Sequence, residues 1–126
     1  MDLFLDGALV DTTTSAKTMN LQNTTRPARI GAGATEGGAQ YFFNGKIDDV
    51  AVWDEALTDA EISALYNSGE TLYAKENYGD YSSKDNLVAY YTMDSDDGAG
   101  TTLTDDEGNN DGSFSGAPSW LSLIHI

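Results

Sequence analysis

The sequence predicts an all-β fold with antiparallel sheets and one short helix near residues 58–66. Two dipeptides that favour two-residue hairpin turns, Asp6-Gly7 and Asn44-Gly45, occur in it. Residues 47–53 alternate in the manner of a strand, and a helix-capping motif follows them. These three observations favour short paired strands with a single helix seated on them.

The first part of the chain is predicted to be a hairpin followed by a polar stretch. Residues 2–10 should form two strands about the Asp6-Gly7 turn. Residues 11–25 are polar and rich in threonine, which is typical of an exposed loop or a frayed edge strand. The remaining expectations here are a loose loop at 34–40 and a strand entry at 41–43.

The stretch from Phe42 to Tyr66 organises the chain. Asn44 and Gly45 both tolerate the positive φ of a type I′ turn, so a hairpin is expected there. After the turn, Ile47, Asp49, Ala51 and Trp53 point to one side of the predicted strand, and Asp48, Val50 and Val52 point to the other. Both faces carry apolar residues, so we expect the strand to lie inside a sheet rather than at a solvated edge.

A capping box predicts where the helix begins. Thr58 is the expected N-cap, and Glu61, three residues later, is placed to return a hydrogen bond to the Thr58 amide. Ile62, Leu65 and Tyr66 follow at helical spacing, which is enough to seat one short helix on a surface.

The residues from Gly45 to Tyr66, GKIDDVAVWDEALTDAEISALY, resemble the end of a known kind of domain. They are similar to the last strand and terminal helix of laminin G-like domains, whose pattern is G-x-I-D-E-V-R-I-Y-N-R-A-L-S-x-x-E-I-x-x-L-Y. The departures are Ala51, Trp53 and Glu55, and all are mild. The resemblance implies a partial concanavalin A-like jelly-roll sandwich and says little about a ligand. Residues 26–30, RPARI, also resemble a strand of this family, so a further strand is implied there.

A second resemblance begins after residue 85. Residues 86–120 resemble the opening of a laminin G-like domain, with Leu87–Met93 as its first strand. We therefore expect the last part of one domain at 1–67, an interdomain linker at 68–85 and the start of a second domain at 86–120. This organisation implies a piece of a tandem array, in which Met1 falls in mid-domain. A linker with three tyrosines can dock on the sandwich, since aromatic side chains resist full exposure.

The last six residues, 121–126, resemble no continuation of the family. Their sequence, LSLIHI, is what translation of a common transposon-based sequencing adapter gives. We expect a non-native tail, and we assign no catalytic role to His125, the single histidine.

Half a sandwich leaves apolar residues in water, which predicts a compensating contact. A sandwich strand needs an opposing sheet to bury its inner face. In jelly-roll relatives the first and last strands are neighbours, so the resemblance implies that Leu87–Met93 pairs antiparallel with Ile47–Trp53. The connection closes this loop easily, because closure entropy grows only logarithmically with length. The core would still be small, and we expect marginal stability.

Composition excludes several classes of partner. The formal net charge is −15, with six basic against 21 acidic residues, so no basic surface exists for nucleic acid or an anionic membrane. No apolar run approaches the roughly 20 residues that a membrane helix needs. There is no cysteine, so disulfides are excluded. Gly31 and Gly33 lack the further residues of a phosphate-binding loop.

Calcium is the cofactor that the acidic loops allow, because it takes carboxylate and carbonyl oxygens. Asp48 is the best candidate ligand, because in related jelly rolls an Asp at this place joins a structural calcium site. Asp94, Asp105 and Asn109 are weaker candidates. The alternative is that these side chains only make hydrogen bonds within the fold. An EF-hand is excluded, because Gly98 stands one place early in the loop.

Catalysis is not expected. Asp48 and Asp49 are adjacent and point to opposite faces, so they cannot flank one glycosidic bond. Aromatic residues could stack on sugars, although packing is the favoured role for most of them: Tyr41, Trp53, Tyr66 and Trp120. The resemblance implies a secreted or cell-surface binding or adhesion module for a glycan or an extracellular protein, next to neighbouring domains. The alternatives are a structural spacer and an accessory module of an extracellular glycoside hydrolase.

Overall fold

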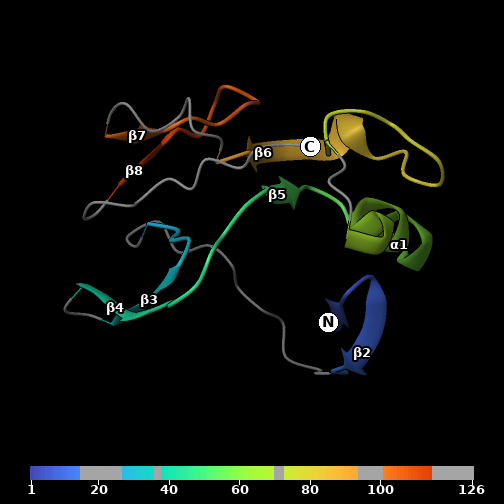
Figure 1. The fold of residues 1–126 in the computed structure, drawn as a ribbon, viewed down its shortest axis with the longest axis horizontal. Coiled ribbons are helices and arrows are strands. Elements are labelled where there is room, and N and C mark those ends of the chain that lie inside the picture. Colours follow the sequence, from blue (N-terminus) through green and yellow to red (C-terminus); the bar gives the residue numbers. More distant parts are fainter. Residues whose placement is uncertain (15–26, 36–37, 70–72, 94–100, 115–126) are drawn as a thin grey trace. The chain divides into compact units, whose positions relative to one another are not determined.

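The computed structural model describes residues 1–14, 27–35, 38–69, 73–93 and 101–114. The chain divides into two compact units, residues 1–13 with 48–126, and residues 14–47. Its described strands form four antiparallel pairs, with one α-helix and two 3-10 helices, which confirms the predicted fold class (Figure 1). The elements are β1 (Asp2–Leu5), β2 (Ala8–Thr12), β3 (Ala32–Thr35), β4 (Gly38–Phe42), β5 (Val50–Trp53), α1 (Asp59–Tyr66), η1 (Asn67–Gly69), η2 (Lys84–Asn86), β6 (Leu87–Tyr91), β7 (Thr102–Leu103) and β8 (Gly112–Ser113).

The β1–β2 hairpin turns at Asp6-Gly7, as predicted. Both residues have positive φ, 50° and 71°, which is the requirement of a type I′ turn. Glycine is also needed for space, because a Cβ on Gly7 would lie 2.8 Å from Cδ1 of Tyr66. The turn of the hairpin therefore packs directly against the last residue of α1.

Helix α1 begins with the predicted capping box. Glu61 N donates to Thr58 Oγ1 at 3.2 Å, and Thr58 N donates to Glu61 Oε2 at 3.0 Å. The helix ends at Asn67, whose φ of 43° is left-handed and whose N–H donates to Ser63 C=O. The described part of the chain contains no helix long and apolar enough to cross a membrane.

Pairing in residues 27–45 differs from the prediction. Asn44-Gly45 is not a hairpin turn, because neither residue has positive φ and β4 pairs with β3. Gly45 instead gives room to the ring of Phe43, whose Cε1 lies 2.6 Å from where a Cβ would stand. The strand expected at 26–30 is also wrong, because its described residues, 27–30, are not in a strand. The loose loop expected at 34–40 is wrong for its described residues, because they belong to β3 and β4. Gly31 turns the chain at φ 75°, and a hairpin of small residues follows it.

The pairing of the two distant strands is confirmed. β5 and β6 run antiparallel, with Val50 opposite Tyr91 and Val52 opposite Ala89. β5 is shorter than expected, because Asp49 has a φ of 49° and leaves the extended conformation. The expectation that this strand lies inside a sheet was wrong for the described residues, where β6 is its single neighbour.

The core lies on one face of this strand pair. Ala74, Leu87 and Tyr90 are buried together, and Trp53 and Leu65 pack against them. On the other face of the pair, Ala89 is buried, whereas Val52 opposite it remains 50% exposed although it is apolar. Ala74 belongs to the predicted linker, so the residues after α1 take part in the core.

Candidate functional site

The segment between α1 and β6 is held by the carboxylate of Glu61. One oxygen, Oε2, closes the capping box, and the other, Oε1, accepts from the backbone and hydroxyl of Ser82 and from the hydroxyl of Ser83. The Ser83 hydroxyl and the Thr58 amide lower the pKa of Glu61 to about 2. The side chain is therefore ionised over the whole physiological range and fixes the segment to the helix N-terminus.

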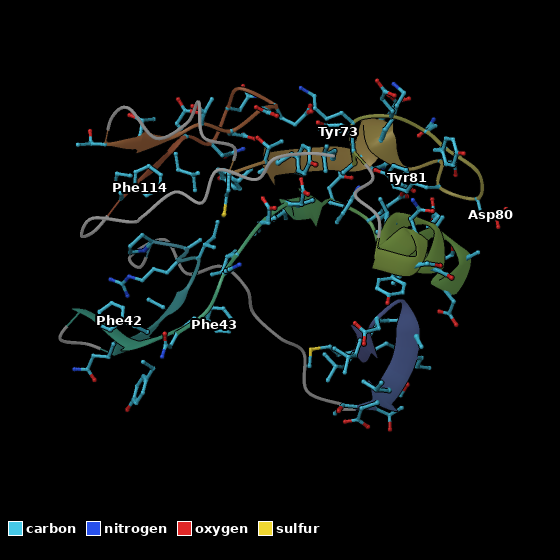
Figure 2. The ribbon with its side chains drawn as sticks, viewed as in Figure 1. Phe42, Phe43, Tyr73, Asp80, Tyr81 and Phe114 are labelled. Atoms are coloured by element: carbon cyan, nitrogen blue, oxygen red, sulfur yellow. The ribbon has the colours of Figure 1, made fainter. Side chains whose placement is uncertain are left out.

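Tyr81 is a second anchor of the same segment (Figure 2). Its hydroxyl donates to Ala74 C=O at 2.7 Å and accepts from Trp53 Nε1 at 2.9 Å. The Trp53 and Tyr81 rings meet edge to face, with centroids 6.3 Å apart. Burial raises the pKa of the Tyr81 phenol. The docking expected for a tyrosine-bearing linker is thus present, whereas the domain boundaries themselves stay a prediction.

Residues 105–111, called here the Asp105 loop, wrap around one buried carboxylate. Asp105 accepts from the backbone amides of Tyr90, Glu107, Asn109 and Asn110 at 2.8–3.3 Å. Burial alone would raise the pKa of this carboxyl, but these N–H donors outweigh it, and the pKa is lowered. Asp105 is therefore an ionised centre around which the loop folds.

The four predicted metal ligands are not brought together among the described residues. Asp48 is exposed, just before β5, and Asp94 lies outside the described residues. The Asn109 side-chain amide donates a hydrogen bond to Glu107 C=O, and its backbone N–H donates one to Asp105 Oδ2. In the described ranges no group of three or more His, Cys, Asp or Glu is placed to hold a metal. The N–H groups around Asp105 also stand where a cation would have to enter.

The surroundings of Asp105 do not by themselves fit a calcium site. Calcium takes six to eight oxygen ligands, roughly at 2.3–2.6 Å, whereas Asp105 is surrounded by hydrogen-bond donors. The calcium site therefore stays a prediction that depends on Asp48 and on residues that the structure does not describe.

Three consecutive aromatic side chains of the other unit are exposed. Tyr41, Phe42 and Phe43 are 78%, 71% and 60% exposed, and Figure 2 labels both phenylalanines at the end of β4. The sequence favoured a packing role for the aromatic residues, Tyr41 among them, and the exposure of the Tyr41 side chain does not agree with that role. The other stacking candidates differ, since Trp53 is bonded to Tyr81, Tyr66 covers Gly7, and Trp120 lies outside the described residues.

A β-bulge presents Tyr41. Ala32 pairs with Phe42 and Gly33 pairs with Gln40, so Tyr41 is the extra residue of β4. Its φ of 53° is left-handed, which is uncommon for a bulky residue and strained. Its ring lies over Gly33, where a Cβ would be 3.3 Å from Cδ2 of Tyr41. Bulges of this kind re-aim a side chain, and here the side chain faces solvent.

Comparison with protein families gives one match. The model of the concanavalin A-like lectin/glucanases superfamily named Laminin_G_3 matches residues 1–63, which is half of the chain. The chain belongs to this family. No curated protein and no solved structure matches it. The matched range runs from β1 into α1 and confirms the resemblance on which the fold was predicted, while the resemblance of 86–120 to a second laminin G-like domain lies outside it.

Membership of the Laminin_G_3 family supports a generic binding module. Laminin G-like domains are typically non-catalytic and extracellular. Two features were not predicted from the sequence: the exposure of Phe42 and Phe43, and the hydrogen bonds that Ser82 and Ser83 donate to Glu61. The run of three aromatic residues beside an Asn-Gly pair was the one signal that could have indicated the exposure of Phe42 and Phe43.

Proposed function

We propose that this chain is a non-catalytic module that binds glycans outside the cell through the aromatic side chains of Tyr41, Phe42 and Phe43. The observation that carries the proposal is the bulge at Tyr41, which holds a large ring in solvent at the expense of backbone strain. The C–H groups of a sugar ring stack well on the negative face of an aromatic ring. Contiguous exposed apolar surface is otherwise unusual and commonly marks a binding site.

The charge distribution also favours a neutral sugar over an acidic one. The net charge of −15 repels sulfated or carboxylated chains at low ionic strength. Neutral hexoses and their oligomers are therefore the ligand class that we propose. A secreted or cell-surface location is part of this proposal, and it is supported by the family, whose members are typically extracellular.

The test is a glycan array followed by titration of the best neutral oligosaccharide. Tyr41→Ala should weaken binding by about fivefold or more, since a stacked ring contributes about 1 kcal/mol. Tyr41→Phe is the matched variant and should bind like the original, because stacking needs the ring and not the hydroxyl. Tyr78→Ala removes an exposed tyrosine from the other unit and should have no effect.

The alternatives predict different results. A structural spacer would bind no glycan on the array. An accessory module of a glycoside hydrolase would prefer the substrate of a catalytic domain on the same polypeptide, which the full-length gene would identify. A structural calcium ion at Asp48 is tested separately, because titration with calcium would raise the thermal midpoint of the original chain and not of Asp48→Asn.

A further inference from the structure

One edge of the β5–β6 strand pair is covered by the Asp105 loop. On β6, Tyr90 N–H donates to Asp105 Oδ1, and Tyr90 C=O accepts from Asp106 N, both at 2.8 Å. Farther along the strand, Val88 C=O accepts from Asn110 Nδ2 at 3.1 Å. These groups lie on the side of β6 away from β5. The loop therefore occupies the backbone positions that another strand would need, which is one way of protecting a sheet edge.

The backbone groups of Ala51 and Trp53 point to the opposite, outer edge of β5. Asp54 N–H donates to Asn86 C=O, so residue 54 faces β6, and alternate residues of a strand face the same way. Ala51 pairs with Tyr90, whose own backbone groups bond to the Asp105 loop, and this gives the same orientation. In the part of the chain that the structure describes, β5 has no second neighbouring strand.

Acidic residues flank β5 in the sequence, with Asp48 and Asp49 before the strand and Asp54 and Glu55 after it. Asp49 accepts a hydrogen bond from the Tyr90 hydroxyl, and Asp54 accepts one from Asn86 Nδ2. Apart from these two, the exposed carboxylates at the two ends of the strand are those of Asp48 and Glu55. The residues of β5 itself are apolar, and Val52 is half exposed. A second copy of β5 added antiparallel would bring acidic ends against acidic ends, which is destabilising. A strand with basic residues at its ends would instead be matched in charge.

We propose that the outer edge of β5 binds an extended segment of a partner protein with Lys or Arg on both sides of an apolar centre. The segment adds a third strand to β5–β6, with backbone hydrogen bonds to Ala51 and Trp53 and ionic contacts at both ends. The covered edge of β6 restricts such addition to β5. The inference uses none of the aromatic residues of β4, so it stands or falls independently of glycan binding.

The probe is the fluorescent peptide Lys-Lys-Val-Thr-Val-Thr-Lys-Lys, and fluorescence anisotropy is measured against the whole chain. We expect saturable binding that weakens with salt. A peptide N-methylated at the residues whose N–H groups face β5 should bind at least about tenfold more weakly, since two hydrogen bonds are lost. A peptide with Glu in place of Lys should show a similar loss. Equal binding of the N-methylated peptide would overturn the proposal, because attraction to acidic charge alone would then explain the result.

Two variants of the chain test the same edge from the other side. Ala51→Pro removes a donor on the outer edge without touching the ladder to β6, and proline is tolerated at such positions. It should weaken binding of the unmethylated Lys peptide, because the hydrogen bond that the Ala51 N–H donates to the added strand is lost. The double variant Asp48→Asn, Glu55→Gln keeps the backbone intact and should flatten the salt dependence. Concentration-dependent dimers that the peptide cannot compete away would show a second copy as the occupant and would contradict the proposal.

Discussion

Replacing Tyr81 by phenylalanine tests whether the segment before β6 is part of the folded core. The variant keeps the ring and its edge-to-face contact with Trp53, and removes one hydroxyl. Two hydrogen bonds are lost, the 2.7 Å bond to Ala74 C=O and the 2.9 Å bond from Trp53 Nε1. Ala74 is buried, so its carbonyl would lose its partner at a cost of about 1–3 kcal/mol.

Trp53 is only partly buried, so water can replace part of its lost hydrogen bond. The loss of this second bond therefore adds only about 0.5 kcal/mol to the destabilisation. The expected loss in the free energy of unfolding is therefore about 1.5–3.5 kcal/mol. For so small a core this is a large fraction of the total stability. Urea unfolding followed by tryptophan fluorescence measures it as a lower midpoint with an unchanged slope.

Tyr78→Phe is the matched control, because the Tyr78 side chain is exposed, and it should change the free energy of unfolding by less than about 0.5 kcal/mol. If Tyr81→Phe behaves like this control, the hydroxyl bonds do not hold the segment, and the reasoning is refuted.

Three further predictions concern the other anchors. The pKa of Glu61 falls from 4.5 to about 2 on folding, so its contribution to stability is complete above pH 4.5 and is lost as the pH falls toward 2. Thermal unfolding between these pH values should show a smaller dependence on pH for Glu61→Gln than for the original chain, and parallel curves would contradict this. Asp105→Asn should lower the free energy of unfolding by about 2 kcal/mol in urea, because the new amide donor faces N–H groups, while Asp80→Asn at an exposed site should be neutral. Gly7→Ala should destabilise the chain more than Gly79→Ala in calorimetry, since both residues have positive φ but only Gly7 has atoms of Tyr66 within 4 Å.

Short sequence motifs predicted the local structure correctly where no tertiary contact opposed them. The Asp6-Gly7 turn and the Thr58–Glu61 capping box depend on residues a few positions apart, and both formed as expected. The same turn logic failed at Asn44-Gly45, because the strand before it already has a partner in β3 and the ring of Phe43 occupies the space over Gly45. The small residues of β3 and β4 carry little alternation, so their hairpin could not be read from hydrophobic pattern.

The site was harder to predict, because residue type does not tell which atoms surround a carboxylate. Asp105 stands in an acidic, Asn-rich loop that resembles a cation site in composition. Its surroundings are backbone N–H groups, and that depends on the path of the loop rather than on the residues in it. The exposure of Tyr41 depends on a bulge, which shifts the register by one residue and leaves no mark in the sequence.

The carboxylate of Glu61 has a consequence for how the molecule opens. Because Oε2 caps α1 and Oε1 holds Ser82 and Ser83, the first turn of the helix and the segment before β6 share one acceptor group. If either the first helical turn or the segment before β6 unfolds, the Glu61 carboxylate loses part of its hydrogen bonds, and the other element loses its acceptor. The two elements therefore behave as one cooperative unit. In hydrogen exchange, the amides of Glu61 and Ser82 should therefore open together, at the same rate, although 21 positions separate them along the chain.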